Sequence, residues 1–252
     1  MTAGPRAERC ELITIPISHY CEKARWALDR AGVPYRERAH LQVIHWFHVK
    51  RAGGGWTAPV LVCGSTVLRE SADIVAWADA RAELGLYPDG APDVRVLESD
   101  FDSRLGPHGR RWMYDSIRGE KALVGRYGLA GVPAWERRAV PVAFPLVARV
   151  IDRYLKITPE SAAESLRIVR DVFDSVATRL ADGRSFLAGD GFTAADLTFA
   201  ALCAPVLVPP EYGVQLPPPD ELPAEMAGVV RELREHPAGK HALEMYRRER
   251  RP

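Results

Sequence analysis

The sequence predicts an α/β domain at the N-terminus and an all-helical domain after it. Over about the first ninety residues, short β-branched apolar runs alternate with helical patterns, whereas the residues beyond them show helical periodicity only. Between the two parts, the segment GLYPDGAP at residues 85–92 has the proline and glycine density of a linker. We therefore expect one domain at residues 1–86 and a second at residues 87–252.

The expected order of elements in the first domain is βαβαββα. Strands are expected where residues are apolar or β-branched between turn residues, and helices where apolar residues recur three or four positions apart. Ser18 and Ser71 are the expected N-caps of the first and last helices. The strands are expected at residues 11–17, 35–39, 60–63 and 66–68, and the helices at 18–31, within 40–56, and from 71 to about 84.

In the second domain, the clearest helix is expected at residues 161–182, where apolar residues follow a 3.6-residue period. Thr193 and Asp196 have the spacing of a capping box ahead of the apolar run 197–208, so we expect a central, buried helix there. The proline-rich stretch 209–223 predicts a loop before a last helix at about 224–248.

Composition and charge favour a small-molecule partner. The chain has 252 residues with 34 basic and 33 acidic side chains, and its net charge of +1 provides no field to attract nucleic acid or an anionic membrane. No stretch approaches the ~20 apolar residues that span a bilayer, and the N-terminus has no apolar leader. We expect a cytoplasmic protein with no nucleic-acid or membrane partner.

The four cysteines, Cys10, Cys21, Cys63 and Cys203, are scattered along the chain. They form neither a CxxC pair nor a zinc-ligand spacing, and this usage best fits a reducing cytosol. Cys21 stands where a redox CxxC pair has its second cysteine, but the first is missing, so two-thiol exchange is disfavoured. Cys21 is expected to be either a small buried residue or, near a helix N-terminus, a reactive thiol.

Three segments resemble successive landmarks in the N-terminal domain of cytosolic glutathione transferases: SHYCEKARWAL, TAPVLV and LRESADIVAWAD. A fourth, FLAGDGFTAADLTFAA, resembles the buried capping-box helix of that family's helical domain. The resemblance is weak from about residue 94 to 158, where the family usually builds its electrophile pocket. It implies a thioredoxin-like first domain, a serine-type member of the family, glutathione as co-substrate without a metal ion, and a homodimer.

By this resemblance, Ser18 donates a hydrogen bond to the glutathione sulfur and lowers the pKa of the thiol. Its place between a strand and a helix agrees with that role, because backbone N–H groups and the positive end of the helix dipole lie beside it. A serine in this place is also an ordinary N-cap. His19 stands where the family often has proline, and Tyr20 is the alternative sulfur contact.

The resemblance also implies the residues that hold glutathione. The bond between Ala58 and Pro59, which follows Thr57, is expected to be cis, so that an extended peptide pairs with the exposed backbone. An ordinary turn proline is the alternative. Ser71 and the start of its helix would bind the γ-glutamyl carboxylate, and Glu70 would face the ammonium group. The alternative here is an N-cap beside a surface glutamate.

Lys50 is the expected contact for the glycyl carboxylate of glutathione. It follows three histidines, His40, His45 and His48, which have spacings of five and three and no cysteine or acidic residue between them. We therefore expect no metal site there.

The helix after the linker carries the candidates for the electrophile pocket. These are Arg111, Trp112 and Tyr114, with Arg104 and Asp115 in the same cluster. Aromatic residues among helical charges also serve in core or interface packing, so both interpretations stay open.

We expect a transferase that adds the thiolate of glutathione, or of a similar small thiol, to a hydrophobic electrophile, as in detoxification. A second hypothesis uses the same thiolate for isomerisation, dehalogenation or cleavage of a particular metabolite. A third is a binding protein with this fold that has lost catalysis. The shared first domain does not separate them.

Overall fold

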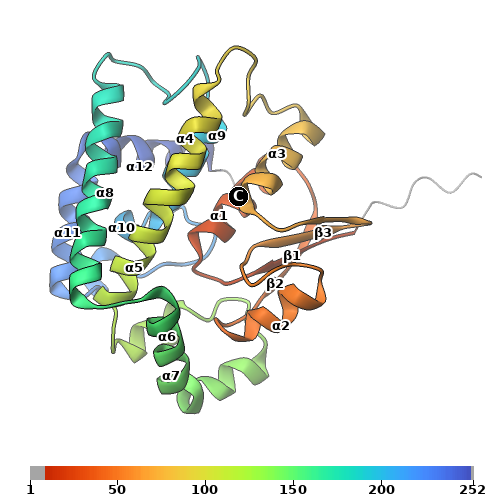
Figure 1. Cartoon of the computed structure of the whole chain (residues 1–252), viewed down its shortest axis with the longest axis vertical. Coiled ribbons are helices and arrows are strands. Elements are labelled where there is room, and N and C mark those ends of the chain that lie inside the picture. Colours follow the sequence, from red (N-terminus) through yellow and green to blue (C-terminus); the bar gives the residue numbers. More distant parts are fainter. Residues whose placement is uncertain (1–8, 251–252) are drawn as a thin grey trace, which may run out of the picture.

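The computed structural model describes residues 9–250, and all their side chains except those of residues 143 and 144. Its first part has the predicted order of strands and helices (Figure 1). The elements are β1 (Cys10–Thr14), α1 (His19–Arg30), β2 (Tyr35–Ala39), α2 (Ile44–Arg51), β3 (Val60–Cys63), β4 (Thr66–Leu68) and α3 (Ser71–Ala82). The expected βαβαββα order is therefore confirmed.

The strands form a mixed sheet in the order β2-β1-β3-β4. β1 runs parallel to β2 and antiparallel to β3, and β3 and β4 form the expected hairpin. Figure 1 shows α1 and α3 on the side of the sheet that faces the other helices, with α2 on the opposite side. This is a thioredoxin-like sheet with one helical face turned toward the second part of the chain.

The second part is helical throughout the described residues. It comprises α4 (Asp93–Asp100), a π-helical turn η1 (Phe101–Leu105), α5 (Gly106–Ser116), α6 (Lys121–Tyr127), α7 (Ala134–Leu155), α8 (Pro159–Leu180), α9 (Ala194–Leu202), α10 (Ala204–Leu207), the 3-10 turn η2 (Pro219–Glu221), α11 (Ala224–Glu235) and α12 (Pro237–Glu249). The combination of a thioredoxin-like sheet and an all-helical part confirms the predicted fold class.

Prolines explain where the predicted helices differ from the structure. The apolar run 197–208 forms two helices, α9 and α10, and Pro205 lies in the first turn of the second one. The expected last helix is also two helices, because Pro237 disfavours helical geometry at His236, which is extended with φ −63° and ψ 143°. The first strand ends at Thr14, ahead of Pro16.

Helix α1 is enclosed between the sheet and the helical part, and its charged side chains are buried with it (Figure 1). The Lys23 ammonium is completely buried and pairs with Glu98 at 3.0 Å and Asp102 at 2.8 Å. Glu22 is also completely buried, and it pairs with Arg250 at 2.8 Å. Since an unpaired buried charge is strongly destabilising, these pairs fix α1 against both α4 and the end of the chain.

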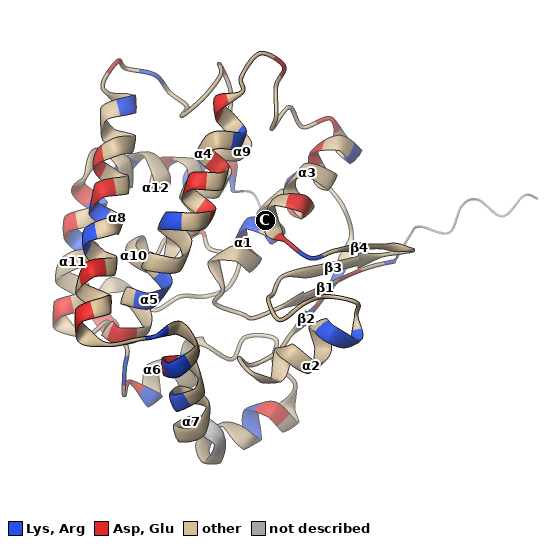
Figure 2. Cartoon of the chain, viewed as in Figure 1, with Lys and Arg blue, Asp and Glu red and all other residues tan. Residues whose placement is uncertain are grey.

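The outer helices carry charges of both signs. Figure 2 shows blue and red residues mixed along α4, α8 and α11. On α8, Arg167 bonds to Glu164 and Asp171, both at 2.6 Å, and Arg170 reaches Glu232 on α11 at 2.8 Å. Such exposed pairs contribute only up to about 1 kcal/mol each, so they mainly keep the surface hydrated. No helix in residues 9–250 combines the length and the apolar character that crossing a bilayer requires.

Two of the four cysteines are joined by a disulfide that their spacing does not predict. Cys10 on β1 and Cys63 on β3 are opposite one another in the antiparallel register, and a disulfide links them. The two cysteines are fifty-three residues apart in the chain, and only the register of the strands brings them together, so no local sequence pattern indicates the disulfide. Cys21 and Cys203 are free and buried.

Asp196 lies at the centre of a buried polar network in the helical part. Its Oδ1 accepts from the Leu187 N–H at 2.8 Å and lies 3.2 Å from Nε2 of His241. Its Oδ2 accepts from the Thr193 N–H at 3.1 Å and from the Thr193 hydroxyl at 2.8 Å. The predicted capping box of Thr193 and Asp196 is confirmed, and it also fixes the loop before α9.

We predict that Asp196→Ala lowers the free energy of unfolding by about 3 kcal/mol or more, because the buried N–H groups of Leu187 and Thr193 lose their acceptors. Urea unfolding of the variant beside the parent measures this. Asp190→Ala, in the exposed turn ahead of the same helix, is the control and should cost less than about 0.5 kcal/mol. Equal losses would mean that the network contributes little.

Candidate active site

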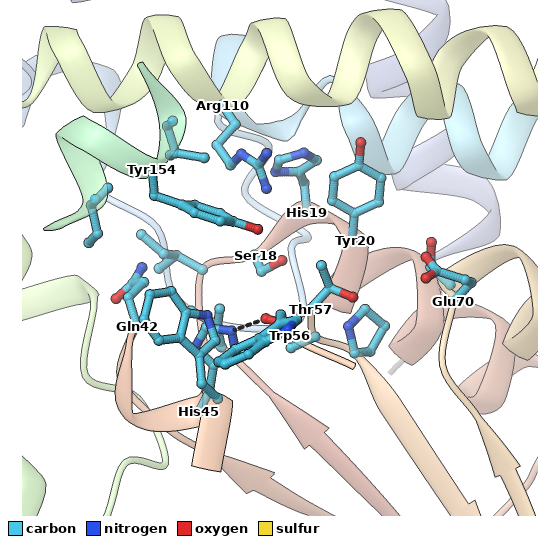
Figure 3. Close-up of a pocket in the computed structure, with 18 of the residues that line it drawn as sticks. Ser18, His19, Tyr20, Gln42, His45, Trp56, Thr57, Glu70, Arg110 and Tyr154 are labelled. Carbon is cyan, nitrogen blue, oxygen red and sulfur yellow. Dashed lines mark hydrogen bonds between the residues drawn. The ribbon is translucent and has the colours of Figure 1, made fainter. Parts of the chain in front are cut away.

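A cavity of about 550 Å³ lies where the sheet meets the helical part (Figure 3). One wall comes from the turn before α1, from α2, from the loop before β3 and from the start of α3. The other wall comes from η1, α5 and the end of α7. A cavity of this size suits a small molecule.

Ser18 lies in the middle of this cavity (Figure 3). It is the N-cap of α1, as predicted, and its Oγ accepts from the Cys21 N–H at 3.4 Å. Since the oxygen acts as the acceptor at the cap, the hydroxyl hydrogen can be donated to a ligand atom. The positive end of the α1 dipole lies at the same position and contributes a favourable electrostatic potential, so an anion beside Ser18 would be stabilised.

Cys21 lies beneath Ser18 and does not line the cavity. Its side chain is completely buried, and its Sγ accepts from the Ile15 N–H at 3.4 Å. Burial raises the pKa of the thiol, and Arg25 only partly opposes this. Of the two expectations for Cys21, these surroundings favour the small buried residue.

Tyr20 borders the cavity, but its hydroxyl is used in the contact between the two parts of the chain. It donates to the Asp102 carbonyl at 2.7 Å. Gly106 leaves room for it, since a side chain at that position would collide with the phenol oxygen. Burial raises the pKa of Tyr20, and the nearby Asp102 and Glu70 carboxylates add to the increase. The hydroxyl is therefore poorly suited to activating a thiol.

The backbone before β3 forms one edge of the cavity. Thr57, Ala58 and Pro59 line it, and Figure 3 places Thr57 on the side of Ser18 away from the helical wall. The Ala58–Pro59 bond is cis, so that expectation is confirmed.

Glu70 and Ser71 lie at the start of α3 and also line the cavity. The structure shifts the expected cap by one residue, because Glu70 occupies the N-cap position and Ser71 is the first helical residue. No side chain caps this helix, so its first N–H groups have no capping acceptor. Burial raises the pKa of Glu70, and Asp73 and Asp102 raise it further. An ammonium group would relieve this crowding of carboxylates.

Lys50 lies outside the cavity lining. Its Nζ is 3.1 Å from the centre of the Trp56 ring, and the side chain is exposed. The cavity itself is bordered here by Gln42, His45, Trp46 and Trp56. A role for Lys50 with the glycyl carboxylate stays a prediction. Of the four bordering residues, the sequence analysis names only His45, as one of the clustered histidines.

His40 and His48 form a group with Glu136, which the fold brings from α7. Glu136 lies 2.7 Å from Nδ1 of His40 and accepts from the Leu41 N–H at 2.9 Å. The two imidazole rings stack at 3.5 Å with their planes 9° apart. Lone pairs in nearly parallel planes do not converge on one ion at the ~2.0 Å that zinc requires. This geometry instead connects α7 to the end of β2.

Only one of the three electrophile-pocket candidates reaches the cavity. Tyr114 lines it and accepts a hydrogen bond from Nε2 of Gln42 at 2.6 Å. Arg111 turns away and donates to the Leu155 carbonyl at 3.0 Å. Trp112 packs in the core with 6% of its surface exposed.

Arg110 and Met113 line the cavity beside Tyr114, and the sequence analysis does not select them. The three residues share one helix face, since they are three and four positions apart. The spacing alone could not select these residues from the sequence, because the sequence does not show which face of the helix is turned toward the cavity.

His19 is buried between Ser18 and α5, close to Arg110 (Figure 3). Burial and the Arg110 charge lower the pKa of His19 to about 3, against the effect of a hydrogen bond with the Gly106 backbone. Its Nε2 is buried and has no hydrogen-bond partner among the described residues. His19 is therefore neutral at ordinary pH and lies at the start of α1, against the helical wall.

The sheet, the cis-proline edge and the helical wall define a thioredoxin-like fold with an added all-helical domain. Residues 12–86 match the family model for the glutathione S-transferase N-terminal domain, and residues 159–227 match the model for the C-terminal domain. Together they cover more than half of the chain. The chain belongs to the glutathione S-transferase superfamily.

Solved structures agree in fold at low sequence identity. The theta class glutathione S-transferase from Xanthomonas axonopodis pv. citri, with glutathione bound, is 20% identical with a TM-score of 0.55, over 93% of this chain and 96% of that one. Beta-etherase LigF from Sphingobium sp. strain SYK-6 is 16% identical with a TM-score of 0.57, over 93% and 98%. Glutathione transferase F2 from Populus trichocarpa is 15% identical with a TM-score of 0.54, over 94% and 99%. No curated protein matches the chain.

We predict that stability falls as the pH drops below about 6.5, and that His19 causes part of the fall. The folded protein holds His19 neutral down to a pKa of about 3, whereas the unfolded chain takes up the proton near pH 6.5. The stabilising effect is thus complete above pH 6.5 and is lost as the pH falls, by about 2 kcal/mol at pH 5. Urea unfolding at pH 7 and pH 5 should show a smaller difference for His19→Asn than for the parent. Identical differences would contradict the assignment.

Proposed function

We propose that this protein is a glutathione transferase that ionises the thiol of glutathione beside Ser18 and adds it to a hydrophobic electrophile. The observation that carries the proposal is the juxtaposition in one cavity of the Ser18 hydroxyl, the backbone edge at Ala58 and the uncapped start of α3. The hydroxyl would bind a thiol, the backbone edge would pair with an extended peptide, and the helix start would bind a carboxylate. Superfamily membership supports the same assignment.

Glutathione would bind along the wall formed by the first domain. Its peptide would pair with the backbone at Ala58, in the manner of an added strand. Its γ-glutamyl carboxylate would bind at Ser71 and the first N–H groups of α3, and its ammonium would face Glu70 and Asp73. This direction carries the cysteinyl sulfur toward Ser18.

The reaction requires the thiolate, because the thiol is a weak nucleophile. A free thiol has a pKa of about 8.5, and a hydrogen bond from Ser18 together with the α1 dipole would lower it toward neutrality. The proton leaves to solvent. The thiolate then forms a carbon–sulfur bond with the electrophile, and the displaced group departs with the electron pair of its bond.

The proposal includes the organisation that the resemblance implies. The thiol-binding domain is residues 1–86 and the acceptor-binding domain is residues 87–252, although residues 1–8 and 251–252 lie outside the described part of the chain. A homodimer, a cytoplasmic location and a role in detoxification belong to the same proposal.

We predict that Ser71→Ala weakens glutathione binding about ten- to a hundredfold, because one hydrogen bond to a carboxylate contributes roughly 1.5 to 3 kcal/mol. Isothermal titration calorimetry measures the affinity, and thermal unfolding should change little. Ser65→Ala, in the exposed turn between β3 and β4, is the control. Unchanged affinity in the Ser71 variant would mean that the carboxylate binds elsewhere.

Ser18→Ala tests the chemical role directly. If Ser18 stabilises the thiolate, the variant should lose turnover, and the pH at which activity rises should move upward, while affinity for glutathione changes little. If Ser18 is only a cap, the variant should lose about 1 kcal/mol of stability and keep its pH profile. The measurement is a pH–rate profile with a chlorodinitrobenzene.

Tyr20→Phe is the matched control for Ser18→Ala. Its hydroxyl is bonded to the Asp102 carbonyl, so the variant should lose about 1 kcal/mol of stability and keep the parent's pH profile. A shifted profile in Tyr20→Phe, with an unshifted one in Ser18→Ala, would transfer the role to Tyr20. Glutathione binding without any turnover in the parent would favour the non-catalytic hypothesis.

A further inference from the structure

Arg110 brings a positive charge to the cavity that no acidic group of the described chain pairs with. It extends from α5 toward the cavity, close to His19 and Tyr154 (Figure 3). Its Nε is buried and has no hydrogen-bond partner among the described residues. Since a guanidinium is always charged, and a partly buried charge is costly without a partner, an anionic group in the cavity would stabilise Arg110.

Among the described residues, none of the acidic side chains of the cavity forms an ion pair with Arg110. Glu70 and Asp73 lie at the start of α3, and Figure 3 shows Glu70 on the far side of Tyr20 from Arg110. Asp102 is paired with Lys23 at 2.8 Å. A second arginine, Arg69, lines the cavity beside Glu70, and its Nε donates to the Gly53 carbonyl at 2.7 Å. The acidic groups and Arg69 thus share one end of the cavity, and Arg110 stands apart on the helical wall.

Arg110 faces the side of Ser18 away from the thiol-binding edge. In Figure 3, Thr57 and Trp56 lie below Ser18, and Arg110 and His19 lie above it. A glutathione molecule on that edge would have its sulfur between the edge and Arg110. The guanidinium is thus directed at whatever molecule meets the sulfur.

The walls around Arg110 are apolar and aromatic. Met113 and Tyr114 follow it on the same face of α5, and Ile151 and Tyr154 contribute from α7. Arg111, its neighbour in the chain, does not line the cavity and donates to the Leu155 carbonyl and the Ser165 hydroxyl. Such a site, with apolar walls and one convergent charge, selects a flat apolar molecule that has one acidic group.

We infer that Arg110 binds the acidic group of the acceptor, and that the preferred electrophiles are aromatic compounds carrying a carboxylate or a similar oxyanion. The inference rests on the proposed function for the thiol. In the reaction, the thiolate displaces a leaving group from a carbon on the acceptor. The oxyanion stays paired with Arg110 throughout and takes no part in bond formation.

Two matched electrophiles test this, namely para-(chloromethyl)benzoate and its methyl ester. Both react by forming a carbon–sulfur bond and releasing chloride, and each enzymatic rate is divided by the uncatalysed rate with glutathione. The parent should prefer the carboxylate. Arg110→Met should lower kcat/KM for the carboxylate about ten- to a hundredfold and change that for the ester less than about threefold. Arg110→Lys should restore part of the preference.

Arg104→Met is the control, because the structure places Arg104 outside the cavity lining, where it is exposed and pairs with Asp100. It should leave both rates unchanged. Equal losses for both electrophiles in Arg110→Met would overturn the inference, because the charge would then serve the thiolate or the fold.

Binding of the two reaction products separates this inference from the proposed function. By calorimetry, the parent should bind S-(carboxybenzyl)glutathione about tenfold or more tightly than its methyl ester. Equal affinities overturn the inference even if Arg110→Met does not fold. A parent that converts neither electrophile but keeps the binding preference would refute the transferase and support the Arg110 site. A parent that converts both without preference would refute the Arg110 site alone.

Discussion

The buried position of helix α1 is the constraint on which the rest of the structure depends. The helix carries Glu22 and Lys23 into the interior, and each charge needs a partner from the helical part of the chain. These pairs stabilise the structure only in one relative position of the sheet and the helices. Ser18 and Tyr20 stand at the N-terminal end of the same helix, so the ion pairs also set the width and shape of the cavity.

The sequence predicts best what local interactions determine. The order of strands and helices, the Ser18 cap and the capping box at Thr193 depend on residues within a few positions of each other, and all are confirmed. The pairing of Cys10 with Cys63 depends on strand register, and the burial of Lys23 depends on packing against α4. Charged residues on a helix ordinarily face water, so no sequence pattern distinguishes this helix from a surface one.

One wall of the cavity is set by local interactions that the sequence shows, and the other is set by the packing of helices. Ser18, Ala58 and Ser71 belong to turns and helix starts, whose chemistry is visible in short motifs. The opposite wall is built by α5 and α7, where resemblance to the family is weak. Arg110 and Arg111 are neighbours in the chain, yet one lines the cavity and the other bonds to Leu155. Selecting between them requires the phase of the helix, which only the packed structure determines.

The π-helical turn η1 sets that phase, since such a turn holds one residue more than an α-helical turn. In a regular α-helix through the same residues, α5 would be rotated by about 100° relative to α4. Gly109 would then take the place of Arg110, and Met113 that of Tyr114. The helical wall would lose its cation, while the wall formed by the sheet and its loops stayed unchanged. The one extra residue held in η1 thus decides which side chains of α5 reach the cavity.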